Sequence, residues 1–314
     1  MLLTDGAAHR DLRRPAARFL APRAVTLHRE RVERMVDAAL ERLPRKGVVD
    51  FASQVAEPIV TAVARTLLGL PATHDRDLAR WSSAIIRMTD PLTPTTVRAR
   101  VENALRECRA FVDDARRVGA LEPSGLAAQV LADKGSLSPQ DGLANAVLLL
   151  VAAIDTTVGQ LCSSMFHLLR HPAEFARLRG DPPRAAGSLA ELVRYDSPVQ
   201  ILTRRITADV STPVGTMRTG EKLMLLLGAA NRDPDRYRDP DRLWLMRPDV
   251  EPLAFGAGPH FCVGVHLAQL TMGSVLRGFI LRYPHPRLAD PEPAWRPSVV
   301  ARRLETLRLN PDSQ

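Results

Sequence analysis

A lone cysteine in a glycine-rich loop is the residue of this chain best suited to chemistry. Residues 255–264 run Phe-Gly-Ala-Gly-Pro-His-Phe-Cys-Val-Gly, and an apolar helix is expected from about Val265. Glycines let the backbone pass close to a flat group where a side chain would clash. Backbone N–H groups at the helix start, with the positive end of its dipole, favour a deprotonated Cys262. A thiolate in such a loop suits axial ligation of a haem iron.

Two other interpretations of this loop fail on spacing. Histidines lie close to Cys262 on both sides, but the chain has no second Cys/His pair at zinc-finger spacing. A dinucleotide-binding loop needs a third glycine where this chain has Phe261, and a strand leading into the loop. For the other two cysteines, Cys108 and Cys162, we expect small buried hydrophobic residues.

A second group of polar residues interrupts an apolar helix in the middle of the chain. Apolar residues recur at helical spacing from Ser138 to Arg170, and a capping-box pattern beginning at Ser138 marks the start of this helix. Asp155 and Thr156 lie within it. From the residues alone, we expect Thr156 to bond to a carbonyl one turn earlier and Asp155 to face solvent or an arginine.

A third motif is a possible ion pair between Glu191 and Arg194, three residues apart on a helix expected from Ser188 to Tyr195. Such a pair contributes about 0.2–0.5 kcal/mol when it is exposed. An alternative is that Ser188 and Glu191 form a capping box, in which case Glu191 closes the helix start.

The remaining elements follow from periodicity and turn residues. Apolar residues recur at helical spacing in five further segments. We expect these helices over residues 25–43, 51–68, 75–88, 97–117 and 265–282. Short runs bounded by turn residues predict strands over residues 201–207 and 222–227.

The motifs and their order resemble the cytochrome P450 family over nearly the whole chain. The loop at Cys262 matches the family signature Phe-Gly-x-Gly-x-His-x-Cys-x-Gly at every defining position. Residues 152–157, Ala-Ala-Ile-Asp-Thr-Thr, resemble its Ala-Gly-x-Asp/Glu-Thr-Thr motif, and residues 191–194 resemble its Glu-x-x-Arg helix. The resemblance implies a mainly α, P450-like helical fold with minor β-sheets, in which residues 1–314 form a single haem-binding domain.

The resemblance also implies a role for each matched residue. Cys262 ligates the iron of haem b, and Asp155 and Thr156 relay protons on its distal face. Glu191 and Arg194 form a buried structural network beneath the haem. The other matched residues that the resemblance assigns to haem binding are His9, Arg13, Arg204, Phe255, Gly256, His260 and Gly264. The two histidines and two arginines among them would hold the haem propionates.

The chain departs from the family pattern in three places. Ala153 stands where the family usually has glycine, and its methyl group would crowd the groove that accommodates dioxygen. Arg247 is the candidate third member of the Glu191 network, although the residues just before it differ from the family's. Family members also carry several helices and strands before the helix that begins near His9, so we expect the N-terminal helices and sheet strands to be missing.

Composition and charge argue against several classes of protein. The formal net charge of the 314 residues is +8, but the basic residues are spread along amphipathic helices and only 4% of residues are aromatic, which argues against nucleic acid binding. The longest uninterrupted apolar run, residues 146–154, is shorter than the roughly 20 residues of a membrane span. Three cysteines without a secretory leader predict a reducing compartment, with the cytoplasm as the default.

These features together predict a haem-thiolate monooxygenase that inserts one atom of dioxygen into a small apolar organic substrate, with secondary metabolism as one setting. Because the chain has no reductase module, the resemblance to soluble bacterial members implies a ferredoxin and its NAD(P)H-dependent reductase as partners. Two alternatives stay open. One is a truncated, catalytically impaired haem-thiolate or ligand-binding protein, and the other is an enzyme that draws its oxidant from peroxide.

Overall fold

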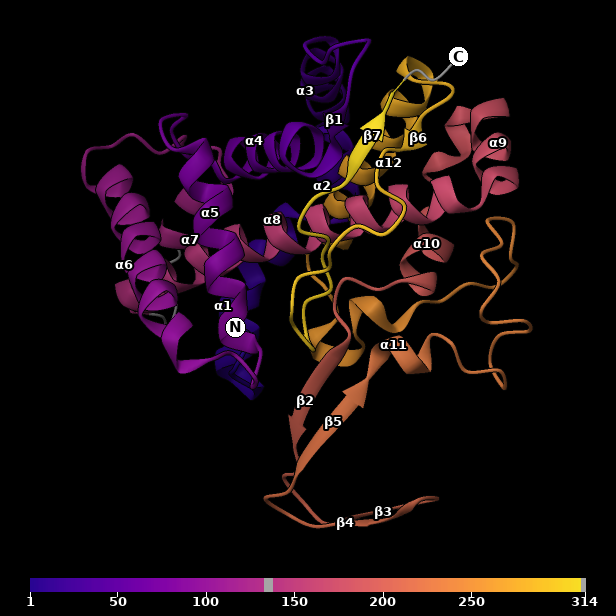
Figure 1. Ribbon diagram of the computed structural model, residues 1–314. Coiled ribbons are helices and arrows are strands. Elements are labelled where there is room, and N and C mark those ends of the chain that lie inside the picture. The colour runs from indigo at the N-terminus through magenta and orange to yellow at the C-terminus, as the bar shows by residue number, and fades with distance from the viewer. Residues whose placement is uncertain (133–137, 312–314) are drawn as a thin grey trace.

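The computed structural model describes residues 1–132 and 138–311 as a mainly helical protein with small antiparallel sheets. The longest helix, α8 (Pro139–Arg170), runs through the middle of the molecule (Figure 1). The helices before it are α1 (Gly6–Phe19), α2 (Pro22–Leu27), α3 (Arg29–Glu41), α4 (Glu57–Leu68), α5 (Asp75–Ile85), α6 (Thr95–Arg117) and α7 (Leu126–Ala132). The helices after it are α9 (Pro172–Gly180), α10 (Leu189–Tyr195), α11 (Leu227–Ala230) and α12 (Val265–Arg282).

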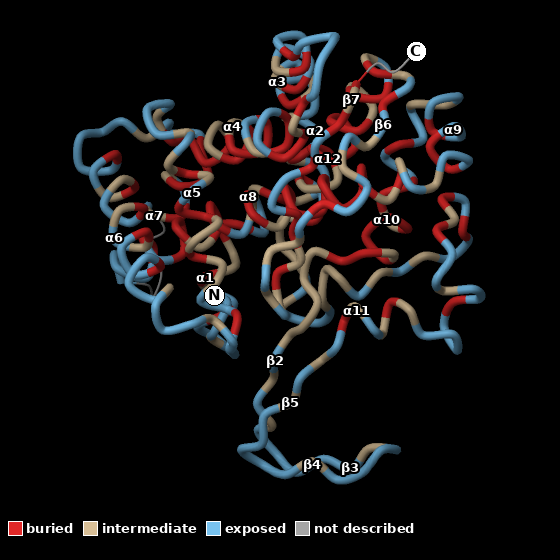
Figure 2. Tube along the Cα trace, in the orientation of Figure 1, coloured by how far each residue is buried: buried red, intermediate tan, exposed pale blue. Residues whose placement is uncertain are grey.

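Helix α8 is the core helix. Ser138 and Asp141 form a reciprocal capping box, which confirms the predicted start. The predicted apolar stripe from Leu143 to Leu168 is buried, and α4, α5 and α7 pack against the helix (Figure 2). Among the described helices, α8 alone is long and apolar enough to cross a membrane, and 78% of its apolar window is buried inside the protein.

Several predicted helices are interrupted where the backbone changes its hydrogen-bond pattern. The helix expected over residues 25–43 divides at His28, whose N–H bonds to the carbonyl of Val25 in a tighter turn. The helix expected over residues 51–68 opens with a π-helical turn, η1 (Phe51–Ala56), before α4. Pro58 has no N–H with which to continue the regular pattern into that turn. Helix α5 ends in a 3₁₀ turn, η2 (Ile86–Thr89).

The strands form three small antiparallel sheets, and the two predicted strands are confirmed to within two residues. A three-stranded sheet has the order β1-β7-β6, formed by β1 (Val49–Asp50), β7 (Arg308–Asn310) and β6 (Arg287–Leu288). The two hairpins pair β2 (Ile201–Arg205) with β5 (Lys222–Leu226), and β3 (Val210–Thr212) with β4 (Gly215–Met217). The β2–β5 ribbon extends away from the helical body and carries the mostly exposed β3–β4 hairpin at its end (Figures 1 and 2).

The last helix, α12, positions the cysteine loop. Its bounds, Val265 to Arg282, are those predicted from the sequence. It packs against α3 and α8 and buries one apolar face, including Leu276 and Phe279. Because Gly264 is its N-cap, the cysteine loop enters the helix directly and is held by the core of the protein.

Candidate functional site

The loop that ends at Cys262 folds back on itself. The N–H of Cys262 donates to the carbonyl of Phe255 at 2.8 Å. Gly256 and Gly258 have φ angles of 72° and 66°, in the left-handed region that favours glycine. At Gly258 and Gly264 an added Cβ would meet no other atom within 4 Å. The residues of this loop therefore allow a flat macrocycle to lie against the backbone.

The protein's own groups do not ionise the Cys262 thiol. Burial raises its pKa, and the hydrogen bond from the Gly264 N–H and the charge of Arg13 offset this only in part. The hydrogen bond from the Gly264 N–H therefore favours the thiolate, as expected from the helix start, but burial has the larger effect on this pKa. Coordination to a metal ion deprotonates a thiol outright. Within the described ranges, no three His, Cys, Asp or Glu side chains are placed together to hold a metal ion.

Helix α1 packs its basic face against this loop. The ring of His9 lies against the ring of His260, with 4.2 Å between their centroids, and Arg13 Nη2 donates to the carbonyl of Phe261 at 2.6 Å. His9 is buried, and its Nε2 has no hydrogen-bond partner in the structure. Burial, together with the charges on His260 and Arg13, lowers the pKa of His9. His9 thus offers a neutral ring nitrogen near pH 7.

Asp5, which the sequence analysis did not single out, brings a carboxylate to the same cluster. Its Oδ1 lies 2.8 Å from Nε2 of His260, and this hydrogen bond lowers the pKa of Asp5. Charges on His9 and Arg204 act in the same direction. A carboxylate therefore already bonds to one of the four side chains assigned to the haem propionates, and the charges of two others act on it. Because a propionate is the same chemical group, the donor set fits haem. Asp5 lies four residues before His9, one helical turn, a spacing that was available from the sequence.

One strip of α8 is open where the rest of its middle is buried. Ala144 and Ala152 are exposed, and Leu148 and Thr156 are partly exposed. Residues four apart share a helix face, so Thr156 lies at the end of this open strip. Its Oγ1 donates to the carbonyl of Ala152 at 2.8 Å, as expected from the residues alone. Ala153, beside the strip, is half-buried.

Asp155 is buried and held by two arginines from the C-terminal segment. Arg296 Nη1 lies 3.1 Å and Arg303 Nη1 lies 2.5 Å from Asp155 Oδ1, and Arg303 also pairs with Glu57. Of the two partners expected for Asp155 from the residues alone, solvent or an arginine, the structure has the arginine. Because both arginines bond to Asp155, a proton relay through its carboxylate requires one of these bonds to open.

Glu191 is the centre of a buried ion network. Arg194 donates to its two oxygens at 2.6 and 2.9 Å, and Arg247 Nε lies 3.2 Å from both. Ser188 makes no side-chain cap bond, so the capping-box alternative is wrong. The guanidinium groups also bond to carbonyls between residues 231 and 242, and they clamp the irregular segment that leads to the cysteine loop.

Comparisons with known proteins identify the family of the chain. A family model described as "Cytochrome P450" matches residues 186–302. Cytochrome P450 107B1 of Saccharopolyspora erythraea is 33% identical over 318 residues, covering 99% of this chain and 77% of the relative. The mycinamicin VIII C21 methyl hydroxylase of Micromonospora griseorubida is 34% identical over 301 residues, covering 94% and 76%. The crystal structure of P450BioI with an acyl carrier protein ligated to hexadec-9Z-enoic acid has a TM-score of 0.91 at 27% identity, covering 99% and 81%. The chain belongs to the cytochrome P450 family.

Proposed function

We propose that the chain uses Cys262 as the axial ligand of haem b and oxidises a small organic substrate with an apolar body. Haem b is the cofactor of the family, and when bound its thiolate-ligated iron activates dioxygen with electrons that come from NAD(P)H through redox partners. The proposal rests on the packing of α1 against the cysteine loop, in which His9 lies against His260 of the loop and Arg13 bonds to the carbonyl of Phe261.

The basic cluster around Asp5 would bind the haem propionates. His9 supplies its unpartnered Nε2, and His260 and Arg204 supply the groups that now act on the Asp5 carboxylate. Arg13, already bonded to the loop carbonyl, would hold α1 in place beside the macrocycle. A propionate bound by these donors would displace Asp5, because two carboxylates that share the same donors repel each other.

Thr156 and Asp155 would handle protons on the open strip of α8. Thr156 would turn its hydroxyl from the Ala152 carbonyl towards the strip and donate its proton there. Asp155, released by one arginine, would take up a proton from solvent and pass it to Thr156. The two residues are adjacent in the chain, one half-buried on the strip and the other buried behind it. This arrangement would connect the reaction space to a buried acid.

The relatives support the class of reaction but not a particular substrate. Several carry the names of hydroxylases, among them a 6-deoxyerythronolide B hydroxylase and a mycinamicin hydroxylase, and others are named for polyketide biosynthesis. We infer a cytoplasmic enzyme of secondary metabolism that receives electrons from a ferredoxin and its reductase. The net charge of +8 favours association with an acidic partner protein.

The reduced carbon monoxide complex tests the thiolate ligand. The wild-type protein should show the red-shifted Soret band of a haem-thiolate, and Cys262→Ala should lose it. Cys108→Ala, a change at a buried cysteine on α6, is the matched control and should keep the band. A red-shifted band in Cys262→Ala, or a wild-type protein that takes up no haem, would overturn the proposal. Turnover with ferredoxin, compared with peroxide alone, then decides the source of the oxidant.

A further inference from the structure

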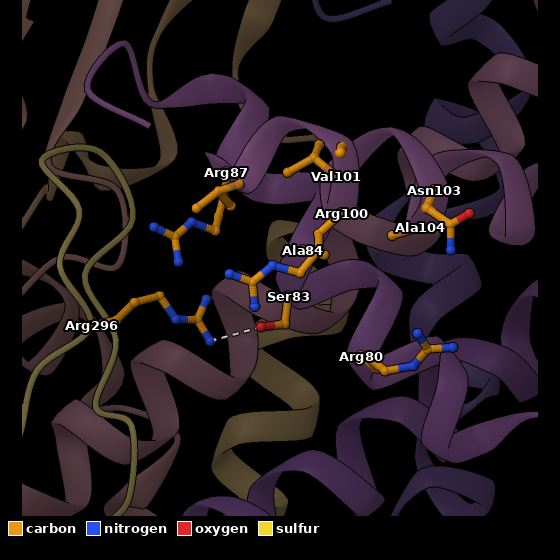
Figure 3. A pocket seen from close by; sticks show the side chains of 11 residues that line it. Arg80, Ser83, Ala84, Arg87, Arg100, Val101, Asn103, Ala104 and Arg296 are labelled. Atoms are coloured by element: carbon orange, nitrogen blue, oxygen red, sulfur yellow. Dashed lines mark hydrogen bonds between the residues drawn. The ribbon is translucent and has the colours of Figure 1, made fainter. Parts of the chain in front are cut away.

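A second site lies between α5 and α6, apart from the cysteine loop. It is an open cavity of about 580 Å³, lined by residues of these two helices, by Arg87 of η2 and by Arg296 of the C-terminal segment. Figure 3 shows the guanidinium groups of Arg87, Arg100 and Arg296 directed towards the same space. Three cations that face one space repel one another, and an anion placed between them relieves that repulsion.

Two of these three arginines form no ion pair with any residue that the structure describes. Arg80, also on the cavity wall, pairs with Asp77 and Glu107 and points away from the common space (Figure 3). Within residues 1–132 and 138–311, no carboxylate forms an ion pair with Arg87 or Arg100. The charge of Arg87 acts on Asp90, whose side chain is already bonded to Leu92, Ser298 and Val299. The cavity therefore presents two guanidinium groups, those of Arg87 and Arg100, that form no ion pair within the described chain.

The third arginine is held in place from behind. Arg296 Nη1 lies 3.1 Å from Asp155 Oδ1, and Nη2 donates to Ser83 Oγ at 2.9 Å. Its side chain is only 12% exposed. Binding to such a fixed guanidinium costs less conformational entropy than ordering a free surface arginine. The same side chain connects the cavity to Asp155, the neighbour of Thr156 on α8.

Apolar side chains make up much of the remaining wall. Ala84 on α5 and Val97, Val101 and Ala104 on α6 line the cavity. A lining of this kind favours methylene groups, whereas a small inorganic anion would leave it exposed to water. The cavity therefore suits a molecule with a negatively charged end and an apolar body.

We propose that this cavity binds the carboxylate end of an apolar acid that is the substrate of the enzyme. The inference rests on the proposed monooxygenase function and narrows its substrate class. Planar guanidinium groups match the two oxygens of a carboxylate, and Arg87, Arg100 and Arg296 supply the fork-shaped donors. A phosphate monoester shares this chemistry and is separated from a carboxylate by the experiment.

Isothermal titration calorimetry of the haem-loaded enzyme tests the site with four probes: decanoate, methyl decanoate, decyl phosphate and inorganic phosphate. Wild-type protein should bind decanoate more tightly than the other three. Arg100→Gln should weaken decanoate binding about tenfold or more, the effect of losing a hydrogen bond to a charged group, and should leave methyl decanoate binding unchanged. Arg98→Gln is the matched control, because Arg98 is an exposed arginine on the same helix outside the cavity lining. It should bind decanoate as the wild type does.

Four outcomes would overturn the proposal. If decanoate and its methyl ester bind with equal affinity, the site does not require a charged end. If Arg100→Gln and Arg98→Gln lose equal decanoate affinity, the effect comes from net charge and not from the cavity. If inorganic phosphate binds as tightly as decanoate, the site does not require an apolar body. If decyl phosphate binds more tightly than decanoate, the site recognises a phosphate and not a carboxylate. The carbon monoxide spectrum of the same preparation keeps the two proposals apart. A red-shifted band without selectivity for decanoate refutes only the acid site, whereas selectivity without the band refutes the haem-thiolate function.

Discussion

The buried network at Glu191 allows a stability prediction with a definite magnitude. Replacing Glu191 by glutamine keeps the side-chain volume but removes the negative charge between Arg194 and Arg247. These two guanidinium groups are 1% and 9% exposed as residues, so neither can recover its lost partner by turning to solvent. Both also bond to carbonyls of the loop segment, which holds them in place.

The expected loss follows from the cost of an unpaired buried charge. Removing one partner of a buried ion pair destabilises a protein by about 3–5 kcal/mol. Here two cations lose the same carboxylate, so we expect the Glu191→Gln variant to lose stability at the upper end of that range. Natural proteins have a total stability of roughly 5–15 kcal/mol, so the loss is a large fraction of it.

Urea unfolding of the haem-loaded protein, followed by circular dichroism, measures the change. The matched control is Glu30→Gln, which removes an exposed pair with Arg34 at 3.5 Å and should cost no more than about 1 kcal/mol. If Glu191→Gln and Glu30→Gln unfold at the same urea concentration, the network contributes no more than a surface pair and the argument from burial is refuted. Haem release at lower urea in Glu191→Gln than in the control is the accompanying expectation.

Two further predictions concern protons. Thr156→Ala should keep haem and substrate binding but lower the rate of product formation by roughly 100-fold, which is the contribution of a general acid. Electrons should then be diverted to peroxide or water. Normal coupling of NAD(P)H oxidation to product formation would show that the proton relay lies elsewhere. Burial raises the pKa of Asp196, but the hydrogen bond from His167 and the charge of Arg302 outweigh it, so the pKa lies below the ordinary value. The stability that Asp196 contributes is therefore present above about pH 4 and is lost as the pH falls through the lowered pKa. Asp196→Asn should unfold more easily at pH 7 with a weaker dependence on acid, and an unchanged acid-unfolding curve would contradict this.

The elements that could be predicted from the sequence are those specified by local rules. Helix α12 begins and ends at the predicted residues because a glycine precedes its apolar pattern and Tyr283-Pro284 follows it. Helix α8 has a complete capping box and an apolar stripe along its length. The break at His28 and the π-helical turn before α4 were missed, because apolar residues continue at helical spacing through both positions and only the hydrogen-bond pattern changes.

The cysteine loop could be assigned from sequence because its signature is contiguous, whereas its protonation could not. Helix-start effects on Cys262 were visible in the order of residues, but the burial that outweighs them depends on packing around the loop. The same holds for His9, whose low pKa comes first from burial. The ring of His9 is therefore a neutral hydrogen-bonding group in the folded protein.

Asp155 shows where local reasoning ends. A carboxylate on the buried face of a helix requires a cationic partner, since an unpaired charge there is too costly, and this predicts that an arginine must face it. Which arginine does so depends on how the chain returns to α8 after more than a hundred residues. In a chain with 43 basic residues no spacing identifies Arg296 and Arg303 in advance. The C-terminal segment selects them, and through Arg296 it also connects the buried acid to the cavity between α5 and α6.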